Sequence, residues 1–186
     1  MKDSPITIGF DDSKFQLKST IKKTQLIGIV CQGTRLVNVV RDEISIDGDD
    51  ATDTLIRLAK LYLKEIQYIL TDTITFGGFN IIDLERIYTQ MYKPIIAITE
   101  SQVNLDSVEA ALSKNFPDTY RQKIEKIINA GELFETEIQT AGGISKVYYH
   151  VKGAPPEEVN ELLRKLCIDS KLPEPIRIAH LIGKAL

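Results

Sequence analysis

The chain has 186 residues, of which 43% are hydrophobic and 26% are charged, and these proportions exclude a disordered or fibrous protein. The formal net charge is −3, whereas a non-specific polyanion binder usually has an excess of basic residues. A local basic patch is still compatible with this charge. No apolar run approaches the roughly 20 residues of a membrane span, and the first residues lack a signal-peptide pattern. We therefore expect one cytoplasmic domain over residues 1–186, with no membrane partner and with Cys31 and Cys167 as buried free thiols.

The first third of the chain predicts a strand, a hairpin and a helix. Ile6–Phe10 is a short apolar run halted by polar residues, which is typical of a buried strand. Gln25–Ile46 holds two β-rich runs joined through a glycine, which predicts an antiparallel hairpin. Apolar residues then recur at helical spacing over residues 55–63, and Asp50 or Thr52 is suited to cap that helix.

The middle of the chain alternates strands and helices. Ile66–Leu70 predicts a buried strand, and Thr75–Asn80 is a glycine-bearing loop that leads into an amphipathic helix over residues 83–91. Pro94–Ile98 predicts the next buried strand. This alternation indicates parallel strands with right-handed crossovers.

The last part of the chain predicts helices on either side of a second hairpin. The expected helices are Leu105–Lys114, Thr119–Asn129, Pro156–Cys167 and Glu174–Ala185, and the hairpin spans Leu133–Val151 with its turn at two glycines. The whole order predicts an α/β fold of the ribonuclease H-like kind, with a mixed sheet, an antiparallel hairpin and helices on both faces.

Two of the predicted strands end in aspartates, Asp11 and Asp72. In an open parallel sheet, ligands gather beyond the carboxyl ends of the strands, so the two carboxylates converge if their strands are neighbours. Paired carboxylates hold Mg²⁺ or Mn²⁺, which can activate a water and neutralise phosphate charge in phosphodiester hydrolysis. The competing interpretation is that these aspartates only make turns or cap helices.

A metal site would need a third acidic group. The candidates are Asp47, Asp49, Asp50 and Asp53, with Glu43 further back, and at least some of these residues could instead form a charged turn and a helix N-terminus. Their spacing does not fit a calcium-binding EF-hand loop, because the glycine comes too early. His150 and His180 lack zinc-ligand spacing, and His180 lies one helical turn from Arg177.

Several segments together resemble a known archaeal family, catalogued as domain of unknown function ninety-nine. They are IGFDDS, DEISIDGDDATDTLIRL, ILTDTITFGGFNIIDLERIY, KPIIAI and LPEPIRIAHLIGKAL, and the resemblance runs nearly end to end. It implies an endonuclease V-like member of the ribonuclease H superfamily. Endonuclease V cuts DNA or RNA near deaminated bases with Mg²⁺ held by acidic residues.

By that resemblance Asp11 and Asp72 match the two strand-end aspartates of the endonuclease V pattern. The intervening acidic residue matches Asp50, or Asp53 with a small shift of register. The resemblance therefore implies that Asp11, Asp72 and Asp50 bind Mg or Mn.

Three departures from the endonuclease V pattern argue against its lesion specificity. Thr73 stands where that family has a glycine after the strand-end aspartate. Thr99-Glu100-Ser101 stands where it has a phosphate-binding lysine, and its proline-tyrosine wedge has no counterpart.

Two hypotheses follow for the function. In the first, the chain is a Mg/Mn-dependent nuclease or phosphodiesterase acting on DNA or RNA, with Asp11, Asp72, Asp50 and His180 as catalytic residues. Asp12 would support the metal ligands and Arg177 would flank the site. In the second, it is a non-catalytic binding or regulatory protein on a degenerate nuclease scaffold, in the form of a homodimer, with the apolar loop Phe76–Phe79 as a contact surface. A small-molecule hydrolase is a third alternative without a sequence feature of its own.

Overall fold

The structure, a computed structural model, describes residues 3–15, 22–99 and 105–186. Within these residues a seven-stranded mixed sheet has the order β3-β2-β1-β4-β7-β9-β8. Its strands are β1 (Ile6–Asp12), β2 (Lys23–Gln32), β3 (Arg35–Ser45), β4 (Tyr68–Asp72), β7 (Ile95–Thr99), β8 (Phe134–Thr140) and β9 (Gly143–Lys152). A separate two-stranded piece, β5 (Thr75–Phe76) and β6 (Asn80–Ile81), folds the expected glycine loop into a small hairpin.

The centre of the sheet is parallel and both of its sides are antiparallel. Strand β1 pairs in parallel with β4, and β4 pairs in parallel with β7. The predicted β2–β3 hairpin is confirmed and pairs antiparallel with β1. Strand β9 adds the second hairpin to the other side by pairing antiparallel with β7, a junction that local sequence patterns did not predict.

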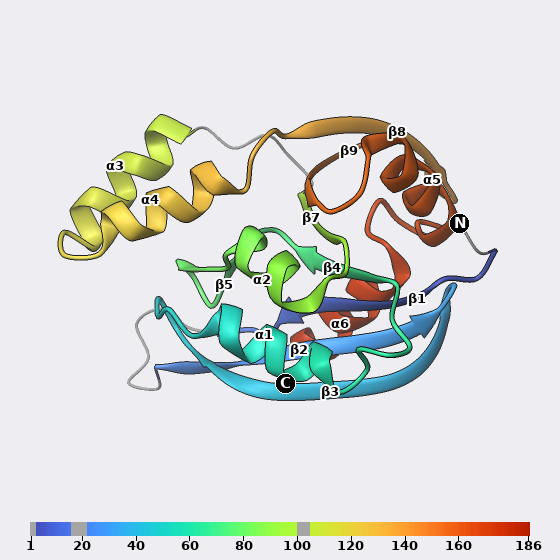
Figure 1. Ribbon diagram of the computed structural model, residues 1–186, viewed down its shortest axis with the longest axis horizontal. Helices are drawn as coiled ribbons and strands as arrows, with labels where there is room; N and C mark the ends of the chain where they lie inside the picture. The colour runs from blue at the N-terminus through green and yellow to red at the C-terminus, as the bar shows by residue number, and fades with distance from the viewer. Residues whose placement is uncertain (1–2, 16–21, 100–104) are drawn as a thin grey trace.

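Helices cover both faces of this sheet, as expected (Figure 1). The helices of the described residues are α1 (Ala51–Lys60), α2 (Leu84–Met91), α3 (Leu105–Asn115), α4 (Tyr120–Asn129), α5 (Pro156–Leu166) and α6 (Glu174–Ala185). Helices α1 and α2 pack on one face against buried side chains such as Ile8 and Phe10, while α5 and α6 cover Leu70 and Ile96 on the opposite face. No helix of the described part of the chain combines the length and the apolar character needed to cross a membrane.

Two glycines allow α6 to lie directly on β1. A Cβ atom on Gly9 would stand 2.8 Å from the backbone nitrogen of Ile176, and a Cβ on Gly183 would collide with the carbonyl oxygen of Asp12. The backbone nitrogen of Lys14 also donates to the carbonyl of Gly183 at 3.1 Å. Because side chains cannot separate the two elements here, residues of α6 lie next to the carboxyl end of β1.

Helices α3 and α4 form a pair that extends from one end of the molecule (Figure 1). Lys123 attaches α4 to the body, and its side chain is buried. Its ammonium group donates to the carbonyl oxygens of Gly48 at 2.9 Å and Phe79 at 2.6 Å. A buried charge is stable only when it is well partnered, so these contacts fix the position of α4.

Candidate active site

Asp11, Asp72 and His180 converge at the carboxyl end of β1 and β4. One ligand atom from each of the three lies within 4.8 Å of the other two. The register explains the meeting of the carboxylates, since Phe10 lies opposite Thr71 and the next residues along the parallel strands are the two aspartates. The expected convergence of Asp11 and Asp72 is therefore confirmed, and His180 reaches them from α6.

Asp11 is the most buried of the three groups. Its side chain is 8% exposed, whereas that of His180 is 38% exposed. Nδ1 of His180 lies 2.8 Å from Oδ2 of Asp11, and the backbone nitrogen of Asp12 donates to Oδ1 at 2.8 Å. Burial raises the pKa of Asp11 above its ordinary value, and these two hydrogen bonds offset only part of that effect.

Asp12 follows on the same strand but contacts a different element. Its Oδ2 accepts a short hydrogen bond from the backbone nitrogen of Gly77, in the β5–β6 hairpin. Burial raises the pKa of Asp12 to about 6, and the negative charge of Asp11 adds to this rise. Asp12 thus connects the site to the glycine loop.

A cavity of about 530 Å³ opens over these groups, lined by Asp11, Asp12, Lys14, Asp72, His180 and Lys184. Lys184 lies one helical turn beyond His180 on α6, so both side chains lie on one face of the helix. We did not predict a role for Lys14 or Lys184, although the i,i+4 spacing from His180 signals the second. The two exposed ammonium groups give the cavity a cationic rim suited to a phosphate.

Among the described residues, the structure does not bring Asp50 into this group. Asp50 precedes α1, and its carboxylate accepts from the backbone nitrogen of Ser45 at 3.0 Å, from the Ser45 hydroxyl at 2.9 Å and from Nδ2 of Asn80 at 2.7 Å. Burial opposes ionisation, but these hydrogen bonds together hold the pKa of Asp50 below its ordinary value. The residues that the structure brings together are thus two carboxylates and an imidazole, while the Asp50 carboxylate contacts Ser45 and Asn80 at the junction of β3, α1 and β6.

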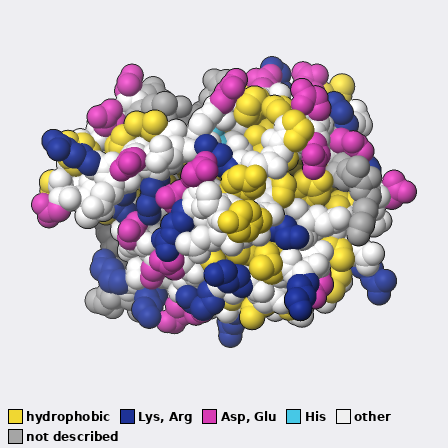
Figure 2. Space-filling view, viewed as in Figure 1, with side chains coloured by type: hydrophobic (Ala, Val, Ile, Leu, Met, Phe, Trp, Pro, Cys, Tyr) yellow, Lys and Arg dark blue, Asp and Glu magenta, His cyan; other side chains and the backbone are white. Residues whose placement is uncertain are grey.

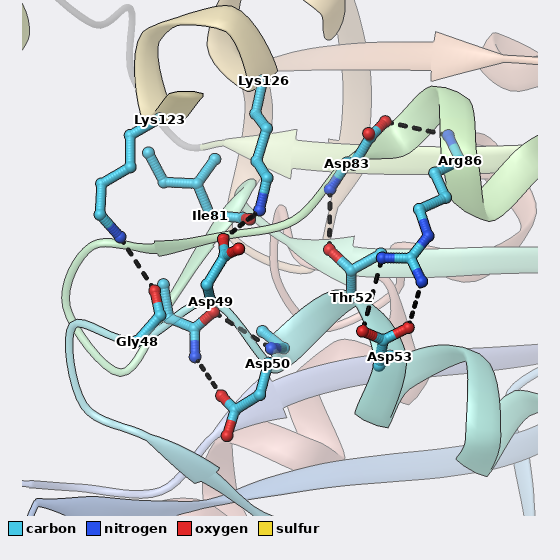
Figure 3. A network of polar contacts seen from close by, with 12 residues as sticks. Gly48, Asp49, Asp50, Thr52, Asp53, Ile81, Asp83, Arg86, Lys123 and Lys126 are labelled. Atoms are coloured by element: carbon cyan, nitrogen blue, oxygen red, sulfur yellow. Dashed lines mark hydrogen bonds and ion pairs between the residues drawn. The ribbon is translucent and has the colours of Figure 1, made fainter. Parts of the chain in front are cut away.

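The other acidic residues near Asp50 are also engaged elsewhere. Asp53 forms an ion pair with Arg86 of α2, and Asp49 forms one with Lys126 of α4 (Figure 3). Asp47 accepts from the backbone nitrogen of Phe79 at 2.9 Å. This acidic run therefore holds neighbouring elements together.

Two other residues singled out in the sequence, Arg177 and His150, lie outside the group. Arg177 forms a double hydrogen bond with Glu174, 2.7 Å for each contact, and a longer ion pair with Asp169. His150 lies on β9. Glu100, in the segment that departs from the endonuclease V pattern, lies outside the described residues.

A second cavity, of about 550 Å³, lies beside the first and is lined mainly by apolar side chains. The chain between them turns at Thr73, whose φ of 59° is in the left-handed region that favours glycine. Hydrogen bonds hold this conformation: the Thr73 nitrogen donates to Ile98 at 2.7 Å, and its hydroxyl donates to the carbonyl of Thr75 at 3.0 Å. Thr73 therefore adopts a backbone conformation that is favourable for glycine and strained for threonine. Backbone strain of this kind is concentrated at functional sites.

A family model described as Endonuclease dU matches residues 6–186. The chain belongs to the endonuclease dU family. A UPF0215 protein of Thermococcus gammatolerans is 35% identical to this family member over 96% of the chain and 90% of that protein.

Two solved structures show that the fold of this endonuclease dU family member is shared. The crystal structure of a protein of unknown function from Archaeoglobus fulgidus superposes with a TM-score of 0.83, at 28% identity, and covers 97% of both chains. Endonuclease V of Ciona intestinalis, in complex with a 24mer DNA containing an inosine followed by a ribo-adenosine, superposes with a TM-score of 0.59. That match is 11% identical over 95% of this chain and 82% of the other, so it shows the fold alone.

Proposed function

We propose that this protein is a divalent-metal-dependent endonuclease that cuts DNA, with the metal held by Asp11 and Asp72 beside His180. The observation that carries the proposal is the convergence of these three groups within 4.8 Å. Membership of the endonuclease dU family and the likeness to a DNA-bound endonuclease V agree with it. We also infer a ribonuclease H-like fold, which the strand order β3-β2-β1-β4-β7 with an antiparallel β2 supports.

The donor set fits a hard divalent cation. Mg²⁺ and Mn²⁺ prefer carboxylate oxygens, which Asp11 and Asp72 supply at the mouth of a cavity. Asp11 is buried deeply enough to raise its pKa, so a cation beside it would compensate for the lost hydration of its charge. When bound, such an ion supplies an activated water and neutralises charge on the phosphate.

The chain's own residues prepare this site. His180 holds the Asp11 carboxylate through the 2.8 Å contact, and α6 holds His180 through its close approach to β1. Lys14 and Lys184 line the cavity and can attract the phosphodiester. They do so although the formal net charge of the whole chain is negative, at −3. Basic and acidic side chains also alternate over the face drawn in Figure 2, so we expect cationic attraction to be local.

Cleavage assays test the proposal directly. Labelled DNA containing a deoxyuridine, the nucleoside abbreviated in the family's name, is compared with inosine-containing and unmodified DNA in Mg²⁺ and in Mn²⁺. We expect metal-dependent cleavage that Asp72→Asn abolishes and that Asp106→Asn, an exposed acidic control on α3, leaves intact. Absence of cleavage in both metals, or full activity of Asp72→Asn, would overturn the proposal.

A further inference from the structure

The second cavity has the composition of a ligand pocket, and it adjoins the candidate metal centre. Asp72 lines the first cavity, and the very next residue, Thr73, lines the second. The remaining walls include Ala97 of β7, Ile127 of α4 and His150 of β9. Small-molecule pockets are typically apolar, with a few polar groups that fix the orientation of the ligand.

The walls of this cavity are preformed. The hydrogen bonds of Thr73 and Thr75 fix the turn on one side. On the other side, Lys123 attaches α4 to the backbone of Phe79 and of Gly48, and Figure 3 draws its contact with Gly48. A ligand therefore needs to order little of the protein when it binds.

His150 is a distinctive polar group of the cavity because its tautomer is fixed. Nδ1 lies 3.1 Å from the carbonyl oxygens of both Gly131 and Glu132. Carbonyl oxygens only accept hydrogen bonds, so Nδ1 carries the proton. Burial lowers the pKa of His150, which favours the neutral form of the ring. Nε2 is then unprotonated and can accept a hydrogen bond. Among the residues that the structure describes, none is hydrogen-bonded to it.

We infer that this cavity holds an unstacked base with a ring N–H beside a carbonyl, as in uracil, and that Nε2 of His150 accepts from that N–H. Cytosine offers a lone pair at the corresponding ring nitrogen, which would face the lone pair of Nε2. Enzymes that act at a base commonly take it out of the stack into such a pocket. The inference rests on the proposed function for its biological meaning, but the recognition step can be measured without cleavage.

The test measures binding in EDTA, where the metal centre cannot act. Fluorescently labelled single-stranded oligodeoxynucleotides carry uracil, cytosine or an abasic position at one place and are otherwise identical. We expect the wild-type protein to bind the uracil strand on the order of tenfold more tightly than the cytosine strand, the scale set by one buried hydrogen bond.

Two substitutions at His150 separate recognition from structure. In His150→Asn the amide nitrogen can still donate to the carbonyls of Gly131 and Glu132, but no atom replaces Nε2. We expect the uracil preference to fall to near unity with affinity for the abasic strand unchanged. His150→Gln places an amide oxygen near the position of Nε2, and we expect it to restore part of the preference.

A third variant keeps the test decisive if substitution of His150 unfolds the protein. Ala97→Leu reduces the cavity volume from the β7 side and should also remove the uracil preference. Equal wild-type affinity for uracil and cytosine, or an unchanged preference in a folded His150→Asn or Ala97→Leu protein, would overturn the inference. Loss of cleavage with retained uracil preference would instead count only against the nuclease proposal.

Discussion

Nδ1 of His180 lies 2.8 Å from Oδ2 of Asp11, and this contact joins α6 to the end of β1. The two residues are separated by 169 positions in the sequence. The geometry of the candidate site therefore depends on how closely the helix approaches the strand.

The first prediction concerns that approach. Gly183→Ala would place a Cβ against the carbonyl of Asp12, and α6 would have to move away from β1. We expect a loss of about 1–3 kcal/mol of stability, typical of overpacking, together with weaker Mn²⁺ binding. Thermal unfolding and calorimetric titration measure the two effects.

Gly142→Ala is the matched control for this glycine. A Cβ there would make only ordinary contact, at 3.7 Å from the Thr140 hydroxyl. Equal behaviour of the two alanine variants would show that the close contact of α6 with β1 is not needed.

The second prediction separates the metal ligands from Asp50. Asp50→Ala removes the acceptor for Ser45 and Asn80 and should cost about 1–3 kcal/mol, because buried donors lose their partner. Calorimetric Mn²⁺ affinity should remain, whereas Asp11→Asn should abolish it. If a folded Asp50→Ala protein no longer binds Mn²⁺, Asp50 is a metal ligand and the prediction is wrong.

The third prediction concerns pH and Asp12, in metal-free buffer. The pKa of Asp12 rises from 3.8 to about 6 on folding, so the folded state binds more protons than the unfolded state between these values. Stability should accordingly fall as pH increases through this window, by about 3 kcal/mol in total. Chemical denaturation at pH 4 and pH 7 measures the change.

Asp12→Asn provides the comparison for this effect. Its uncharged amide oxygen can still accept from Gly77, so the fall in stability between pH 4 and pH 7 should shrink. An identical pH profile for the two proteins would mean that Asp12 is not the source of the dependence.

The fourth prediction concerns the two lysines of the first cavity. Lys14→Ala and Lys184→Ala should each weaken DNA binding and reduce the slope of log affinity against log salt by about one for each lost phosphate contact. Fluorescence anisotropy at several salt concentrations gives the slope. Lys60→Ala, at an exposed position of α1, should leave it unchanged.

Local patterns were sufficient to predict the elements that carry the two aspartates. The apolar runs that end at Asp11 and Asp72 have few alternatives to buried strands, and neighbouring parallel strands bring their carboxyl ends together. The β2–β3 hairpin followed from its central glycine, since Gly33 has a positive φ of 59°.

The partner of Asp50 and the second cavity both depend on long-range packing, so they could not be predicted from the sequence. Asp50 has an acidic neighbourhood that fits a metal ligand, but its partner Asn80 is 30 positions away and cannot be inferred from spacing. The second cavity likewise needs α4 and β9 to meet beside β7, a meeting that depends on the fold as a whole.

The separation of β1 and α6 along the chain has a consequence during translation. The ribosome produces β1 first and α6 much later, and domains fold as units while synthesis proceeds. A nascent chain that stops before α6 carries both carboxylates but lacks His180 and Lys184. The proposed nuclease would therefore gain its complete site only after α6 emerges.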